Sequence, residues 1–367
     1  MGNQSRPPKI GVFLLFLVLL IAIPLVQAVI FTFSPLKPHS TESAIFEVQK
    51  GQNPNELTKA LINRGIISQG KKFLWVGRIG RQWSRVKAGE YRFSPTMSPA
   101  SIFSVLTSGV SMKYPLTLRE GENMYELAQD LESKNLAKKE EFLALCKNPD
   151  FIASLGLFHD LPPTSLEGYL FPDTYFFNKA MTNTDMIKQM VKHFFDFWGP
   201  HEQERSIQLK LTRHEIITLA SMIEKETGAP EERPLISSIF HNRLHLKMRL
   251  QSDPTTIYGM WDRYHGKIHK KDLLEKNKYN TYTIQALPVG PIANPGKESI
   301  QAALFPAESP FLYFVSHNDG THKFSKTIQE HNQAVQKYQL DPKARLGKSW
   351  RDRLKNNQVL SKTKNSK

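Results

Sequence analysis

An apolar run near the N-terminus constrains this chain more than any other feature. Residues 10–33 form a stretch of 24 residues without a charge, and a helix needs about 20 apolar residues to cross a bilayer. Arg6 and Lys9 precede the run with no acidic residue, which predicts that residues 1–9 stay on the cytoplasmic side. We therefore expect a cytoplasmic segment at 1–9, a transmembrane helix at 10–33 and an exported remainder.

The same run could instead belong to a cleaved signal peptide. Residues 26–28 have the small-residue character of a cleavage site after an apolar core. However, residues 29–31 are also apolar, and cleavage before them would expose them at a new N-terminus. The membrane anchor is therefore favoured, and residues 34–43, rich in Pro, Ser and Thr, are typical of a short spacer.

The rest of the chain is long enough for two or three domains. With 367 residues and 40% apolar content, it can bury a separate core in each domain of roughly 100–200 residues. The net charge of +15 is uneven, because the tail at 341–367 carries nine Lys/Arg against two Asp. Nucleic acid, anionic lipid and acidic proteins attract such a tail by the same Coulomb force. A solvated extension without a specific ligand is favoured, and no nucleic-acid partner is expected.

This basic tail leads to a first testable prediction. The residues after Leu340 lack apolar periodicity, so we expect them to stay unpacked. Ending the chain at Leu340 should leave the melting temperature nearly unchanged, as circular dichroism would measure. A large fall in melting temperature would show that the tail docks on the folded core.

Cysteine and histidine chemistry finds little support in the sequence. Cys146 is the only cysteine, which excludes an intrachain disulfide and a cysteine-based metal cluster. His214 begins a pattern like that of a zinc-protease helix, but Thr218 stands where the second His belongs. His241 and His245 are correctly spaced, but no Glu follows the first of them. We therefore expect no metal and no cofactor.

A weak internal repeat follows the spacer, at an offset of 70 residues. Residues 46–57 match residues 116–127 at a Gly, an Asn, a Glu and a Leu. Each copy alternates apolar residues, turns at the Gly and continues with Leu at helical spacing, which predicts a strand, a tight turn and a helix. Between the copies we expect a strand at 88–93 and a helix at 98–108. We group 44–150 as a region of small βα modules.

A helix predicted at about 213–227 carries two carboxylates near its C-terminal end. Glu224 and Glu226 both fall on margins of its apolar face, so periodicity does not rank them. Partial desolvation at a margin is expected to raise the pKa of a carboxyl group, which suits a general acid. The alternative is a surface ion pair with Lys225 or Arg233.

Two later segments contribute further polar residues. Asp253 and Pro254 are expected to be the N-cap and first residue of a helix that runs through Tyr258. The segment 287–296 is dense in Pro, Gly and Asn, which predicts an ordered or mobile loop. Loops of this kind line sites or only connect elements.

Several strings in the second half resemble those of the MltG (YceG-like) family of endolytic murein transglycosylases. In chain order they are EGYLFPDTY (167–175), ASMIEKET (220–227), NRL (242–244), RLQSDPTTIYG (249–259), NTY (280–282) and FV (314–315), followed by His322, Phe324, His331 and Asn332. Their order and spacing carry the resemblance, which extends from the apolar run to about Tyr338.

The resemblance implies a fold class and an activity. The fold class is α+β, with an N-terminal transmembrane helix, small LysM-like βα modules and an α+β catalytic domain at 160–340. The implied activity is lytic cleavage of peptidoglycan between MurNAc and GlcNAc, leaving 1,6-anhydroMurNAc ends through internal cuts in new strands. It also implies an inner-membrane protein with its catalytic domain in the periplasm, working beside peptidoglycan synthases. The modules then either bind glycan or only position the catalytic domain.

By the same resemblance, Glu224 takes the position of the catalytic glutamate. One carboxyl can serve as acid and then as base, because the attacking C6 hydroxyl belongs to the substrate. The residues expected to orient the sugars are Gln251, Ser252, Asn280, Thr281 and Tyr282. The alternative from another class is a membrane-tethered peptidoglycan-binding scaffold without catalysis, which should tolerate loss of the glutamate.

Overall fold

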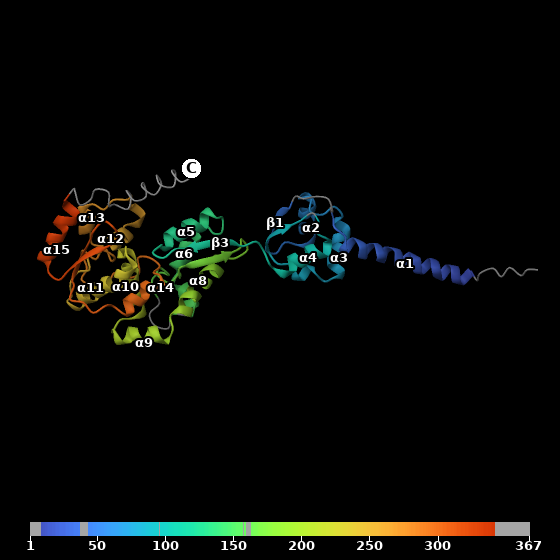
Figure 1. Ribbon diagram of the computed structural model, residues 1–367. Helices are drawn as coiled ribbons and strands as arrows, with labels where there is room; N and C mark the ends of the chain where they lie inside the picture. Colours follow the sequence, from blue (N-terminus) through green and yellow to red (C-terminus); the bar gives the residue numbers. More distant parts are fainter. Residues whose placement is uncertain (1–8, 37–42, 95, 157, 159–162, 342–367) are drawn as a thin grey trace, which may run out of the picture. The chain divides into compact units, whose positions relative to one another are not determined.

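The structure, a computed structural model, describes residues 9–36, 43–94, 96–156, 158 and 163–341 (Figure 1). These residues form two compact units. The first unit runs to Pro115 and includes Phe176–Thr182, and the second contains Leu116–Tyr175 and the residues from Asn183 onward. Nearly all of the segment 1–9, and the basic tail after residue 341, lie outside the described residues.

The first unit begins with the long helix α1, Lys9–Phe33, which continues through Pro24. Its stretch Leu15–Phe33 is long and apolar enough to cross a membrane, and none of it is buried. The helix expected from the apolar run is therefore confirmed, and its length and composition are compatible with a single-pass anchor.

A small α+β module follows α1 in the first unit. Its elements are β1 (Ala44–Val48), α2 (Pro54–Asn63), α3 (Gly70–Ile79), the 3₁₀ turn η1 (Trp83–Arg85), β2 (Gly89–Phe93) and α4 (Pro99–Ser108). β1 and β2 pair antiparallel, with Phe46 opposite Tyr91, and the helices bury aromatic and aliphatic side chains against one another. The strand and helix predicted between the repeat copies are confirmed as β2 and α4, with Ser98 as the N-cap of α4.

The two repeat copies adopt the same local structure. In the second copy, β3 (Tyr114–Leu118) leads into α5 (Met124–Ser133). Asn53 and Asn123 each accept backbone N–H bonds at a helix start, and a Glu three residues later bonds back to the cap. The turn glycines have φ of 79° and 77°, a conformation that favours Gly. The strand, turn and helix of each copy are confirmed, and the chain divides between the copies at Pro115.

The second unit is mainly helical, and the last two residues of its strand β4 belong to the first unit. After α5 its elements are α6 (Lys139–Cys146), α7 (Pro149–Ser154), β4 (Asp173–Phe177), α8 (Asn183–Phe197), α9 (Pro200–Gln208), α10 (Arg213–Glu226), η2 (Pro230–Glu232), α11 (Arg233–His245), α12 (Asp253–Gly259), η3 (Trp261–Arg263), α13 (Lys270–Leu274), α14 (Lys297–Leu304), β5 (Tyr313–Ser316), β6 (His322–Ser325), α15 (Ile328–Val335) and the π-helical turn η4 (Gln336–Leu340). The strands form the two-stranded sheets β1–β2, β3–β4 and β5–β6. This mixture confirms the α+β class.

The core of the second unit is built around α10. Every residue from Ile216 to Ile223 is buried, because α9, α11, α12 and α14 pack around the helix. The predicted helix is confirmed, but the expectation of one buried face with polar margins is wrong, since its neighbours enclose it. Glu224 and Glu226 follow the enclosed part and are partly exposed.

The segment 287–296 folds as a loop whose end is buried around Asn294. The Asn294 Oδ1 accepts the N–H groups of Gly168 and Leu170 at 2.9 and 3.2 Å. Its Nδ2 donates to the Glu122 carbonyl at 3.0 Å. This one side chain therefore joins the turn of the second repeat to the segment that follows Glu167.

Candidate active site

Glu226 ends α10 with its carboxyl group facing the start of α12. The Ser252 hydroxyl donates a hydrogen bond to the Glu226 Oε1 at 2.6 Å. Desolvation of the partly buried Glu226 carboxyl raises its pKa to about 7, and the charge of Asp253 adds to the rise. The Ser252 hydrogen bond and the Arg243 guanidinium oppose it. A carboxyl with this pKa can both donate and accept a proton at neutral pH.

Glu224, two residues earlier, points to a different set of partners. Its Oε2 accepts the Gly296 N–H at 3.0 Å, and its Oε1 lies 3.8 Å from the Arg233 guanidinium. Burial raises the pKa of the nearby Glu120, and the charge of Glu224 raises it further. The 3.8 Å separation is an ion-pair distance without a hydrogen bond, and the buried Arg233 Nε has no hydrogen-bond partner among the described residues.

Of the residues expected to bind sugar, Ser252 is the one that contacts the Glu226 carboxyl directly. It is buried, and its N–H donates to the Thr281 hydroxyl at 2.9 Å. It is also the N-cap of α12. The prediction of Asp253 as that N-cap is wrong by one residue, because Asp253 already has helical backbone.

Gln251 precedes Ser252 in a strained backbone conformation, with φ of 51°. Its N–H donates to the Thr281 carbonyl at 3.3 Å, and its side chain is exposed. A positive φ at a residue other than Gly costs of order 1 kcal/mol or more and is frequent at functional sites. The exposed Gln251 side chain thus directly precedes Ser252, the residue that binds the Glu226 carboxyl.

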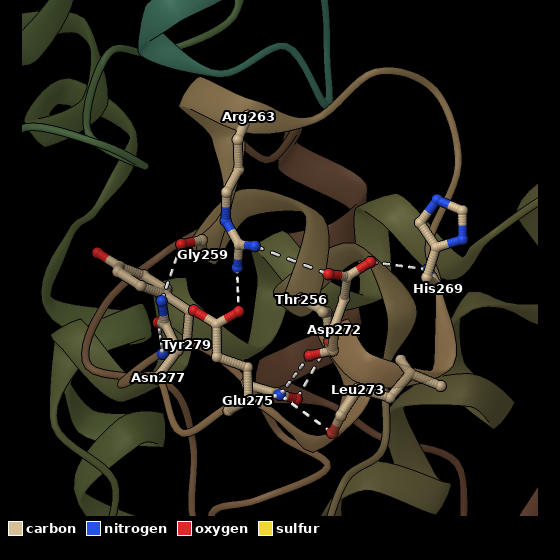
Figure 2. A network of polar contacts seen from close by, with 10 residues as sticks. Thr256, Gly259, Arg263, His269, Asp272, Leu273, Glu275, Asn277 and Tyr279 are labelled. Atoms are coloured by element: carbon tan, nitrogen blue, oxygen red, sulfur yellow. Dashed lines mark hydrogen bonds and ion pairs between the residues drawn. The ribbon is translucent and has the colours of Figure 1, made fainter.

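Asn280 and Thr281 are buried, and protein groups bind their side chains. The Asn280 Nδ2 donates to the carbonyls of Asp272, Leu273 and Glu275, and its Oδ1 accepts the Thr256 hydroxyl. Figure 2 shows the network around Asp272 and Glu275, with Arg263 bonded to both. The Thr281 hydroxyl accepts the Ser252 N–H. The hydrogen bonds of these two side chains therefore fix the positions of the neighbouring backbone segments.

Tyr282 lies at the edge of the site. Its hydroxyl donates to the Asp253 Oδ1 at 2.7 Å, and burial raises the pKa of Tyr282. The charge of Asp253 raises the pKa of Glu226, and the charge of Glu226 raises the pKa of Tyr282. Gln251, Ser252, Tyr282 and Glu226 thus form one cluster in the second unit, whereas Glu224 lies outside it.

Glu167 is a buried acid that the sequence did not single out as a titrating group. Its carboxyl accepts the Met124 N–H and, at 2.9 Å, the Tyr258 hydroxyl. Burial raises the pKa of Glu167 to about 8. Its one sequence signal is that it directly precedes the uncharged segment 168–172, and its contacts tie the start of α5 to α12.

A cavity of about 750 Å³ lies beyond the other end of α12. Tyr125, Tyr258, Trp261 and Tyr279 contribute aromatic rings to its wall. Neither Glu224 nor Glu226 lines it, so this cavity is separate from the carboxyl cluster.

Within the described ranges, no group of three or more His, Cys, Asp or Glu is arranged to hold a metal ion. The His241 Nε2 lies 2.9 Å from the Ala303 carbonyl oxygen, which gives this histidine a structural contact.

Comparison with known proteins identifies similar chains. Residues 46–337 match the family model described as the YceG-like family. The chain is 32% identical to the Bacillus subtilis protein named endolytic murein transglycosylase, over 83% of this chain and 87% of that protein. A Streptococcus pneumoniae protein of the same name is 27% identical, over 84% of this chain and 61% of that protein. A crystal structure of a yceG-like protein from Listeria monocytogenes is 31% identical with a TM-score of 0.55, covering 80% of this chain and 100% of that chain.

Proposed function

The chain belongs to the YceG-like family, and from this premise we propose that it is a peptidoglycan lytic transglycosylase in which Glu226 is the acid and base. The names of its relatives support the reaction class. The observation that supports the residue is the Glu226 carboxyl, whose pKa is raised to about 7 beside Ser252.

The proposed reaction needs only one carboxyl group. Glu226 first protonates the glycosidic oxygen between MurNAc and GlcNAc, and the bond from that oxygen to C1 of MurNAc breaks. The C6 hydroxyl of the same MurNAc then attacks C1 and returns its proton to Glu226. The product is a 1,6-anhydroMurNAc end. Because the C6 hydroxyl belongs to the same sugar as C1, the enzyme does not have to position a separate water as nucleophile. Hydrolytic glycosidases, in contrast, use two carboxyl groups.

The choice of Glu226 departs from the family-based assignment of Glu224, which stays an untested prediction. Glu224 differs in its contacts, because the Gly296 N–H binds its Oε2 and the Arg233 guanidinium forms an ion pair at 3.8 Å from its Oε1. The contacts of Glu226 favour catalysis, since its carboxyl accepts the hydroxyl of Ser252, which follows the exposed Gln251 in the chain. We propose that Gln251 and Tyr282 meet the sugar, and that Ser252 orients the Glu226 carboxyl, with Asn280 and Thr281 behind them.

A family-based setting completes the proposal. The substrate is nascent peptidoglycan, cut within strands, at the outer face of the inner membrane to which α1 anchors the chain. The module region 44–150 is LysM-like and guides glycan to the catalytic domain at 160–340, and peptidoglycan synthases are the expected partners.

Digestion of long glycan strands tests whether the cuts are internal. An endolytic enzyme should lower the average length of the strands at early times, whereas accumulation of disaccharides alone would contradict this mode.

The raised pKa of Glu226 predicts the pH dependence of the reaction. A general acid acts in its protonated form, so kcat/KM should fall about tenfold per pH unit as the pH rises above about 7. Ser252→Ala removes a hydrogen bond that lowers this pKa, so the fall should move to higher pH. Asp253→Asn removes a charge that raises it, so the fall should move to lower pH. Shifts in the same direction for the two variants would contradict the assignment.

A further inference from the structure

A long basic stretch crosses the module of the first unit. Between Glu56 and Glu90 the chain has no acidic residue. It carries eight cations in this interval, at Lys59, Arg64, Lys71, Lys72, Arg78, Arg81, Arg85 and Lys87. Five of them lie in α3, in the η1 turn or between the two, so this part of the module has a strong positive charge.

The cations on α3 and η1 are exposed and have few partners. In the part of the chain that the structure describes, no carboxylate pairs with Lys71, Lys72, Arg78, Arg81 or Arg85. The Lys72 ammonium lies 5.6 Å from the centre of the Phe31 ring of α1. This charge is therefore available to an external anion.

The same helix exposes large apolar side chains. Trp75 is 59% exposed and Ile79 is 62% exposed, and their spacing of four residues places them on one face of α3 with Lys71. Exposed Trp beside cations on an amphipathic helix is typical of segments that lie in a membrane interface.

A cavity of about 570 Å³ joins this face to the candidate membrane helix. Leu25, Val29 and Thr32 of α1 line it together with Trp75 and Ile79 of α3, and the C-terminal end of α1 meets α3 (Figure 1). α1 has 25 residues and a length of about 37 Å, whereas the hydrocarbon core of a bilayer is about 30 Å thick. Helix α1 is therefore long enough to span the core with the end that contacts α3 at the level of the lipid headgroups.

We propose that α3 and η1 form a second membrane contact that binds anionic phospholipid headgroups of the bilayer spanned by α1. The lysines and arginines bind the phosphates, while Trp75 and Ile79 enter the interface next to α1. This inference rests on the proposed membrane placement of the chain. Such a contact would restrict the motion of the first-unit module relative to the bilayer.

The test uses the full chain in nanodiscs, with bromines on the lipid acyl chains near the headgroup. Bromine quenches the fluorescence of a tryptophan only at close range. We expect quenching in discs that contain phosphatidylglycerol, because Trp75 of the unmodified chain lies in the interface. Trp75→Phe should remove about half of this quenching or more. Trp261→Phe, which alters a part-exposed Trp of the second unit, should leave the quenching nearly unchanged.

Charge-reversal variants distinguish binding to the lipid headgroups from a purely apolar contact with the bilayer. Lys71→Glu with Arg78→Glu should reduce the quenching of Trp75 and remove its dependence on phosphatidylglycerol, whereas Lys134→Glu with Lys188→Glu in the second unit should not. Thermal melting confirms that each variant folds.

The outcomes separate this inference from the function on which it rests. A chain that stays in the discs with Trp75 unquenched, or quenched equally in phosphatidylcholine discs, would overturn the headgroup contact alone. A chain that does not enter discs would overturn the anchor, and this inference with it. Cleavage of peptidoglycan by the same preparations is measured separately and bears only on the catalytic proposal.

Discussion

Glu226→Gln is expected to lower the rate of glycan cleavage by at least about 10²-fold, the lower part of what a general acid and base contributes. Glutamine keeps the size of the side chain and still accepts the Ser252 hydrogen bond, but it cannot deliver a proton. Folding should change little, and circular dichroism checks it. The measurement is the initial rate at which anhydro ends appear in digested sacculi, determined by mass spectrometry.

Glu224→Gln is the matched comparison, two residues away on the same helix. Its contacts with Arg233 and the Gly296 N–H predict a cost to stability of about 1 kcal/mol and a loss of activity of less than about tenfold, since a structural ion pair acts on the rate only indirectly. The reverse order, with Glu224→Gln inactive and Glu226→Gln active, would restore the family-based assignment of Glu224. Two equally active variants would exclude both glutamates.

Asn294→Ala should destabilise the second unit more than most single substitutions. The change leaves the buried N–H groups of Gly168 and Leu170 without acceptors, at about 1–3 kcal/mol each. We therefore expect a loss of about 3 kcal/mol and a fall in melting temperature of roughly 6–12 °C for a unit of this size. The measurement is thermal unfolding of the full chain in detergent.

Asn277→Ala provides the control for Asn294. Asn277 also makes side-chain bonds to backbone, to the Gly259 carbonyl and from the Tyr279 N–H (Figure 2), but it is only partly buried, so water can replace these contacts. Its loss should lower the melting temperature by roughly 2–4 °C. Equal effects of the two variants would show that the burial of Asn294 does not set its cost.

The elements predicted correctly are those that local patterns determine. The apolar run gives α1, and the alternation, turn Gly and capping Asn of each repeat give the same strand and helix twice. The periodicity at 213–227 gives α10 within one residue of its observed end. Each of these features depends on residues within a few positions of one another.

The features that the sequence did not predict depend on packing between distant segments. Periodicity treated Glu224 and Glu226 alike, but the fold brings Ser252 to Glu226, and Gly296 and Arg233 to Glu224. Asn280 is a plausible sugar ligand by residue type, yet neighbouring carbonyls occupy its amide. The enclosure of α10 likewise follows from four helices whose positions no short pattern encodes.

Cleavage of sacculi in water enriched with ¹⁸O is the most direct measurement of the lytic mechanism. The C6 hydroxyl of MurNAc is the proposed nucleophile, so no oxygen from the solvent enters the product. We predict new 1,6-anhydroMurNAc ends without ¹⁸O, formed by the unmodified chain and nearly absent with Glu226→Gln. Reducing MurNAc ends that each carry one ¹⁸O would identify hydrolysis by water and contradict the lytic mechanism, and an absence of new ends would contradict catalysis itself.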